Sequence, residues 1–174
     1  YSDKDRALTY RYFNSLKNFK YPSIIYEKNS DSTLTSSIYL TPKERFSLGL
    51  DMDISHSNIQ NIGMGFGLST GIRNIFKGTE ILNFGIKNTL GASRNSADTN
   101  DKFFNIFELG GDIKIRFPKI ISPFSLEKLI AKDMDPSTQI TFGTTLQENI
   151  GLDKQYFGTT FEYEWRTTNN RRFI

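Results

Sequence analysis

The sequence predicts a mostly β protein in which a helix and two strands precede an antiparallel transmembrane β-barrel segment of about six strands. Apolar side chains alternate with polar side chains or glycine along successive runs. Each run is close to the roughly nine to eleven residues that a tilted strand needs to cross the hydrocarbon. Aromatic residues gather near the ends of these runs, as they do in the girdles of membrane barrels: Phe46, Phe76, Phe103, Phe104, Phe117, Tyr156 and Trp165.

The composition is compatible with such a segment. Only 37% of the residues are hydrophobic and the mean hydropathy is −0.45, but lipid meets only every second side chain of a barrel strand. No stretch approaches the roughly 18 apolar residues of a membrane helix, which excludes a helical membrane protein. A soluble β-sandwich also alternates. The length of the runs and their aromatic ends favour the membrane.

Net charge and cysteine content exclude other classes. The 22 basic residues are scattered among 19 acidic ones, for a net charge of +3. A nucleic-acid-binding protein needs a concentrated basic patch, so no nucleic-acid partner is expected. The chain has no cysteine, and therefore neither a disulfide nor a thiolate metal site can hold the fold.

The first part of the chain has a different period. Ser2 followed by Asp5 resembles a capping box, and apolar residues then recur every four positions, which predicts a helix over about 3–18. These residues are Leu8, Tyr12 and Leu16. Two short strands follow near 22–28 and 33–41, joined by a turn at 29–32 and closed by Pro42.

From Phe46 onward the period is two. The expected strands are 46–55, 62–73, 80–93, 104–117, 138–148 and 156–167. On one face the side chains are apolar and should meet lipid, among them Leu50, Phe66, Phe84, Ile113 and Phe142. On the other face they are charged or glycine and should line a lumen, among them Asp51, Gly65, Lys87 and Lys114.

The connections between these strands predict an orientation. If the first part of the chain is periplasmic, the loops 56–61, 94–103 and 148–155 face outward. The connections 73–80 and 118–138 then face the periplasm. Apolar residues within the longer connection predict a short helix over about 125–132, lying at the membrane interface.

Catalytic and metal-binding motifs are weak. The glycines of 63–67 lack the third glycine of a dinucleotide loop, because position 68 is Leu, and they fit an inner barrel wall better. Asp51 and Asp53 share a face with His56 nearby, but a polar lumen explains them better than a metal site. The run 98–101 is typical of a solvated loop rather than a calcium site. We therefore expect no enzyme, no cofactor and no metal.

Several motifs resemble one family. Residues 1–5 and 16–19 are similar to the second helix of a POTRA domain, and 40–43 to its final strand. The run from Arg73 to Glu80 resembles a signature turn between barrel strands, carried by Arg73, Asn74, Phe76, Gly78 and Glu80. Residues 107–111 with 117–118 resemble a later strand and its exit. The chain thus resembles the BamA/TamA outer-membrane assembly superfamily, in its TamL-like branch.

The resemblance implies a domain division and a location. Residues 1–44 would be the C-terminal part of a periplasmic POTRA domain (a helix plus two strands), and 45–174 the N-terminal strands of a transmembrane β-barrel. The location would be the outer membrane of a Gram-negative bacterium. About six strands cannot close a membrane barrel, so the chain is expected to be a piece of a larger protein.

The resemblance also implies a function: insertion or translocation and assembly of outer-membrane proteins, by lateral opening of the barrel and strand templating. The implied partners are outer-membrane lipids, nascent outer-membrane proteins and periplasmic or accessory assembly proteins (TamB-like or Bam-like). The first barrel strand would lie at a weak seam through Ser47, Gly49, Asp51 and Asp53. Alternatives are a two-partner secretion transporter, a passive porin-type channel and an outer-membrane lipase. The last would need a Ser and His pair, and His56 is the one histidine.

Overall fold

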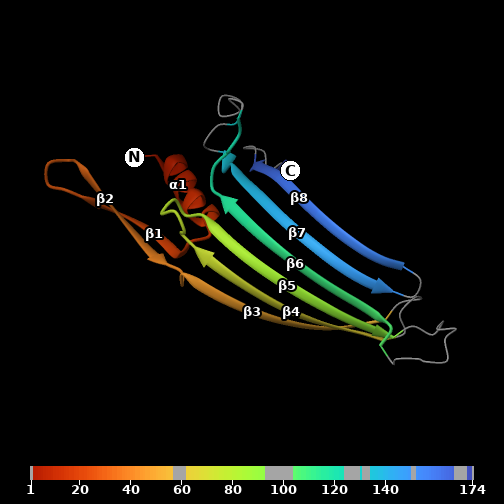
Figure 1. The fold of residues 1–174 in the computed structure, drawn as a ribbon. Helices are drawn as coiled ribbons and strands as arrows, with labels where there is room; N and C mark the ends of the chain where they lie inside the picture. The colour runs from red at the N-terminus through yellow and green to blue at the C-terminus, as the bar shows by residue number, and fades with distance from the viewer. Residues whose placement is uncertain are drawn as a thin grey trace, which may run out of the picture.

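The computed structural model describes residues 2–56, 62–92, 104–123, 130, 134–149, 152–166 and 172–173. One helix, α1 (Asp3–Ser15), begins the chain. A two-stranded antiparallel sheet follows, and then a seven-stranded antiparallel sheet whose strands pair in chain order (Figure 1). The strands are β1 (Phe19–Lys28), β2 (Leu34–Pro42), β3 (Phe46–Ser55), β4 (Ile62–Arg73), β5 (Ile81–Ala92), β6 (Ile106–Phe117), β7 (Ser137–Asn149), β8 (Leu152–Arg166) and β9 (Arg172–Phe173). The prediction of a mostly β chain with one leading helix is confirmed. The six strands expected from residue 46 onward pair consecutively in one antiparallel sheet.

The capping interaction at the start of α1 was predicted correctly, but the end of the helix was not. The Ser2 hydroxyl accepts a hydrogen bond from the Asp5 backbone N–H at 3.3 Å. The helix ends at Ser15 rather than near 18, because Lys17 takes a left-handed conformation (φ 58°) that a helix cannot continue. The Lys17 backbone N–H donates to the Asn14 carbonyl at 3.2 Å, and this hydrogen bond closes the last turn.

The first hairpin begins earlier than the predicted 22–28. Phe19 and Lys20 already pair with Pro42 and Thr41, and a register irregularity separates them from Ser23. Tyr21 lies within this irregularity at φ 49°, beside a proline that has no N–H to donate. The turn at 29–32 is confirmed, since Asn29 donates its backbone N–H to the Thr33 carbonyl at 2.9 Å.

The β7–β8 hairpin is longer than predicted. We expected an outward loop over 148–155, but β8 begins at Leu152 and pairs with Asn149. The residues 153–155 are polar and carry no apolar alternation, yet the backbone ladder continues through them because β7 supplies partners. The short β9, which pairs with Trp165 and Arg166, was not predicted. The helix expected over 125–132 and the loop 94–103 lie largely outside the described residues.

The strand register divides the large sheet into two faces. Phe84, Ile113 and Phe142 pair directly across β5, β6 and β7, and Leu50 and Phe66 lie on the same face. The opposite face carries Asp51, Gly65, Lys87 and Lys114, as well as most of the strand glycines. The predicted division of these residues between two faces is confirmed. Contact of the apolar face with lipid stays a prediction.

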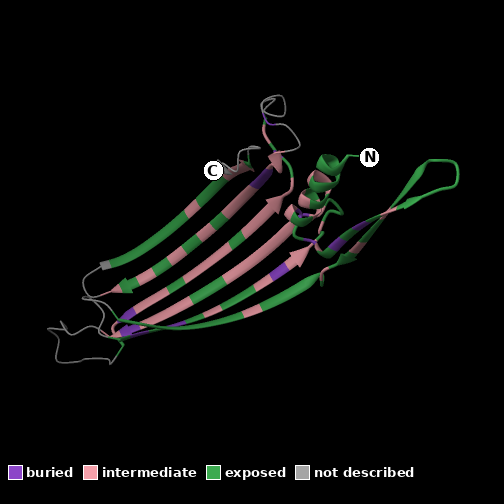
Figure 2. Cartoon of the chain, turned by 180° about the vertical axis from the view of Figure 1, so that it is seen from behind, coloured by how far each residue is buried: buried purple, intermediate pink, exposed green. Residues whose placement is uncertain are grey.

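Within the described residues, no element covers the apolar face. The buried hydrophobic side chains are few. They lie in residues 2–44, which we call the first unit (α1, β1 and β2), at the start of β6 and in the β6–β7 connection: Leu16, Ile24, Ile106, Ile120 and Ile130. Figure 2 shows exposed and intermediate residues along most of the length of the strands. On β3, the side chain of Leu50 is 75% exposed and that of Ile54 is 81% exposed. An apolar face of this extent is typical of a surface that meets lipid or another protein.

No helix in the described ranges combines the length and the apolar character needed to cross a membrane.

The first unit lies at one end of the large sheet. Its helix α1 is next to the β4–β5 turn and the β6–β7 connection, and the far end of its β1–β2 hairpin projects away from the sheet (Figure 1). The first sheet ends at Pro42 and the second begins at Phe46. Hydrogen bonds and an ion pair connect the unit to this end of the sheet, and we call the contact region the junction. The division into domains at 44/45 stays a prediction.

Candidate functional site

The predicted signature turn, 73–80, is organised around the buried carboxylate of Glu80. One oxygen, Oε2, accepts hydrogen bonds from the backbone N–H groups of Phe76 at 3.2 Å and Gly78 at 3.0 Å. Glu80 is 7% exposed. A Cβ on Gly78 would overlap the Glu80 side chain, so glycine is needed there for this close approach.

Asn74 closes the same turn. Its backbone N–H donates to the Glu80 carbonyl at 2.7 Å, and its side-chain oxygen accepts from the Thr79 N–H at 3.1 Å. Asn74, Lys77 and Thr79 all have positive φ, between 58° and 66°. Asparagine tolerates this conformation better than most residues. Asn74, Gly78 and Glu80, three of the five signature residues, therefore stabilise the conformation of this turn.

Arg73 and Asn18 connect the turn to the first unit. The Arg73 guanidinium donates through Nη1 to the Glu44 carbonyl at 2.9 Å, and its backbone N–H donates to the Arg45 carbonyl at 2.8 Å. Asn18, which is 6% exposed, donates through Nδ2 to the Thr79 carbonyl at 2.8 Å. The backbone carbonyl of Asn18 accepts a hydrogen bond from the Lys43 N–H at 2.8 Å. Asn18 belongs to the segment 16–19 that carries part of the resemblance, but its bond to the turn 73–80 was not predicted.

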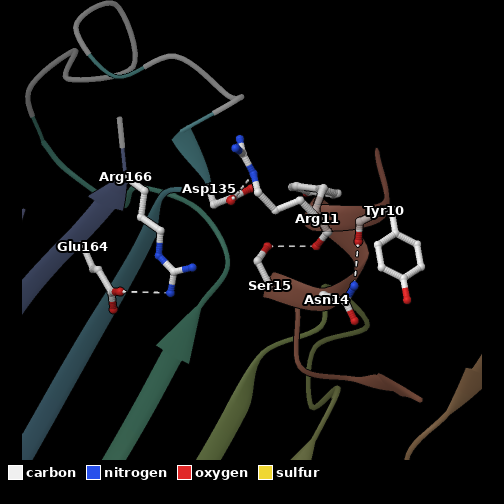
Figure 3. Close-up of polar contacts among 8 residues, drawn as sticks. Tyr10, Arg11, Asn14, Ser15, Asp135, Glu164 and Arg166 are labelled. Carbon is white, nitrogen blue, oxygen red and sulfur yellow. Dashed lines mark hydrogen bonds and ion pairs between the residues drawn. The ribbon is translucent and has the colours of Figure 1, made fainter. Parts of the chain in front are cut away.

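A second contact at the junction joins α1 to the β6–β7 connection. Arg11 Nε lies 2.9 Å from Asp135 Oδ2, and the Asp135 side chain is 4% exposed (Figure 3). The hydroxyl of Thr138, a fully buried residue, accepts from the Ile121 N–H and donates to the Lys119 carbonyl, both at 2.8 Å. The described ends of this connection are thus held against β7, and α1 rests on them.

The predicted seam strand, β3, pairs on one side with β4. Ser47, Gly49, Asp51 and Asp53 lie opposite Gly71, Ser69, Gly67 and Gly65, all on the polar face. No other strand of the described residues pairs with the second edge of β3. An unpaired edge presents free N–H and C=O groups that can template another strand.

The glycines of β4 make room for polar side chains of the two flanking strands. Gly65 and Gly71 are buried, whereas Phe66 and Leu68 between them are exposed, which reverses the usual pattern of a water-soluble sheet. A Cβ at Gly65 would lie 2.6 Å from Asp53 Cγ, and a Cβ at Gly71 would lie 2.6 Å from Ser47 Oγ. The row of glycines is therefore a shallow channel occupied by side chains of β3 and β5.

Among the described residues, the polar face carries charged side chains that pair with one another. Lys87 pairs with Asp53 at 3.1 Å, and Gln139 donates to Glu162 at 3.2 Å. Near the C-terminal end of β8, Arg166 Nη2 lies 3.8 Å from Glu164 Oε1 (Figure 3). Among the residues that the structure describes, no group of three or more His, Cys, Asp or Glu side chains could hold a metal ion. The candidate calcium run 98–101 lies outside that part of the chain.

Comparisons with known protein families, with curated proteins and with solved structures found no match.

Proposed function

We propose that this chain is part of an outer-membrane protein insertion and assembly factor that acts by lateral opening of a barrel and strand templating. In this proposal, residues 1–44 lie in the periplasm of a Gram-negative bacterium and the large sheet forms barrel wall. The partners are outer-membrane lipids, nascent outer-membrane proteins and accessory assembly proteins (TamB-like or Bam-like).

The two faces of the sheet support the membrane location. A strand of 12 residues, such as β4, extends about 40 Å. Tilted by about 45°, it spans about 28 Å, close to the roughly 30 Å of a bilayer core. One face presents exposed apolar side chains, and the other contains buried glycines and the Lys87–Asp53 ion pair. This distribution is typical of a wall between lipid and a polar lumen.

The unpaired edge of β3 is the observation that supports strand templating most directly. Its apolar face is exposed from Phe46 to Ile54, and its second edge has no strand partner in the described chain. Unpaired backbone groups are costly in lipid, so an incoming strand would be stabilised by pairing there. Strand addition supplies main-chain hydrogen bonds to many different sequences, which suits a factor with many substrates.

The junction supports a fixed relation between the first unit and this edge. Arg73 donates to the Glu44 carbonyl and pairs its backbone with Arg45, directly before β3 begins. The first unit is thereby held at the start of β3. A periplasmic substrate guided by that unit would meet the free edge first.

Photo-crosslinking in the full-length protein tests this function. A photo-reactive residue is placed at Ser47, Asp51 or Asp53 on β3, with controls at Glu108 and Asp112 on β6. All five positions lie on the polar face. A nascent barrel substrate should crosslink to β3 and not to β6. Equal crosslinking to the two strands would reject strand templating at this edge.

A second candidate is a passive channel, favoured by the charged polar face and the Lys87–Asp53 pair. In planar bilayers, a channel would give steady conductance whose ion selectivity changes when Lys87 is replaced by Gln. An assembly factor should instead accelerate the folding of a barrel substrate into vesicles. A two-partner secretion transporter would release its substrate across the membrane rather than into it.

A further inference from the structure

A cavity of about 340 Å³ lies at the junction, between the first unit and the β4–β5 turn. It is within the usual size range of ligand pockets, about 300–1,000 Å³. Its walls come from three segments that are far apart in sequence. They are the approach to β1, the link between β2 and β3, and the turn 73–80, and they supply Asn18, Phe19, Pro42, Lys43, Arg45, Arg73, Asn74, Ile75, Lys77 and Thr79.

The charged residues among these are all cationic: Lys43, Arg45, Arg73 and Lys77. The nearest carboxylate in the turn, Glu80, is occupied by the N–H groups of Phe76 and Gly78. Glu44 contributes its backbone carbonyl to Arg73, and Glu44 itself is an exposed residue. Within the described residues, the cavity therefore has an excess of positive charge that attracts an anion.

Two buried polar atoms at this cavity have no hydrogen-bond partner among the described residues. Arg73 Nε is a donor, and Asn18 Oδ1 is an acceptor. Buried polar groups are nearly always satisfied, so a ligand that reached these two atoms would be stabilised by the hydrogen bonds that they lack. Together they favour a ligand that accepts from a guanidinium and also donates a hydrogen bond.

We propose that this junction cavity binds a phosphate group that carries a hydrogen-bond donor. The phosphate oxygens accept hydrogen bonds from Arg73 Nε and from the surrounding lysine and arginine side chains. Asn18 Oδ1 accepts a hydrogen bond from the donor group of the ligand. Hydrogen phosphate has its own P–O–H group. A phospholipid head group has a neighbouring hydroxyl or ammonium, so both sources share this chemistry.

The surroundings favour the lipid as the source. The rings of Phe46 and Phe76, which flank the cavity in sequence, are 65% and 67% exposed. Arg45 lies over the Phe46 ring at 5.7 Å. Exposed aromatic rings beside cationic side chains are typical of the depth at which lipid head groups lie. Phosphate binding at this cavity does not depend on strand insertion at β3. The binding experiments can therefore contradict the phosphate site without contradicting the proposed function, and the reverse also holds.

The first experiment measures binding of inorganic phosphate to the full-length protein in detergent micelles by calorimetry, at constant ionic strength. The test variant is Lys43→Gln with Lys77→Gln. The matched control is Lys20→Gln with Lys154→Gln, which removes the same charge from exposed residues outside the cavity. We expect saturable binding that weakens by about tenfold or more in the test variant and is unchanged in the control. Sulfate, which has no donor for Asn18 at neutral pH, should bind more weakly than phosphate.

The second experiment identifies the source. Native mass spectrometry counts phosphatidylglycerol molecules retained by the same three proteins. Retention by the wild type and the control, and its loss in the test variant, assigns the site to a lipid head group. Binding of inorganic phosphate without retained lipid assigns it to free phosphate. The proposal is overturned if neither ligand binds saturably, if the test and control variants bind alike, or if sulfate binds as tightly as phosphate.

Discussion

Lys87 Nζ and Asp53 Oδ1 lie 3.1 Å apart although their strands, β5 and β3, are not neighbours in the sheet. Strand β4 separates them, and the two side chains meet above its polar face. In the register, Lys87 pairs with Gly67 and Asp53 pairs with Gly65. A Cβ on Gly65 would overlap the Asp53 carboxylate, so glycine at this position leaves room for the ion pair. A sequence feature that suggested a nucleotide loop, the glycines of 63–67, therefore has a packing explanation.

A double-mutant cycle of Lys87→Gln and Asp53→Asn should give a coupling energy of about 0.2–1 kcal/mol, because both side chains are close to half exposed or more. Gly65→Ala should reduce this coupling to near zero, since the added Cβ displaces the Asp53 carboxylate. The measurement is urea unfolding of the full-length protein. Gly143→Ala is the matched control, because its Cβ would meet only ordinary contacts at 3.8–4.0 Å. Loss of coupling in both variants would contradict this explanation.

Phe66→Arg tests the assignment of the apolar face to lipid. Phe66 lies near the middle of β4 and is 40% exposed. If that position is at mid-membrane, the substitution should destabilise the folded protein in bilayers by about 2–4 kcal/mol. Lys87→Gln on the opposite face should have a much smaller effect. Similar small effects of the two substitutions on folding into bilayers would reject the assignment.

Glu80→Ala should destabilise the protein by about 1–3 kcal/mol, because it leaves two backbone N–H groups of the turn without their acceptor. Glu80→Gln keeps a side-chain oxygen and should cost less. Glu44→Ala is the control, since only the backbone carbonyl of Glu44 is used. Equal unfolding midpoints for Glu80→Ala and Glu44→Ala would show that the buried carboxylate does not organise the turn.

The turn between β1 and β2 should show a pH-dependent contribution. The Thr33 hydroxyl and then its backbone N–H donate to the Asp31 carboxylate, and these bonds hold the pKa of Asp31 below its usual value of about 3.9. The stabilisation is therefore present above that usual value and is lost as the pH falls through the lowered pKa. In Thr33→Val, the Asp31 midpoint followed by NMR should move upward. An unchanged midpoint would mean that the hydroxyl is not the main cause.

Local chemistry explains which parts of the fold could be predicted from sequence. A period of two sets the strand faces because successive side chains point to opposite sides, and this holds for Leu50, Asp51 and their partners. The cap at Ser2 depends on residues only three positions apart. The conformation of the turn 73–80 depends on Asn74, Gly78 and Glu80, all within the turn.

The missed features depend on tertiary partners. Nothing near Arg11 in sequence indicates that it meets Asp135, and Asn18 carries no motif that predicts its bond to Thr79. The residues 153–155 are strand only because β7 extends far enough to pair with them. The junction cavity likewise needs three distant segments to be placed together. These contacts, the longer strand and the cavity all result from how the elements pack, and the periodicity of the sequence does not indicate that packing.

Cysteine labelling of intact cells tests the orientation of the sheet. Lys77 lies in the β4–β5 turn at the junction end, and Lys154 lies at the opposite end, where β8 leaves its hairpin with β7. If residues 1–44 are periplasmic, the junction end must be periplasmic as well, because Arg73 and Asn18 hold the turn against the first unit. An impermeant thiol reagent should therefore label Lys154→Cys in intact cells. It should label Lys77→Cys only after the outer membrane is permeabilised. Labelling of Lys77→Cys but not Lys154→Cys in intact cells would reverse the orientation. Equal labelling of both before permeabilisation would show that no membrane separates the two ends of the sheet.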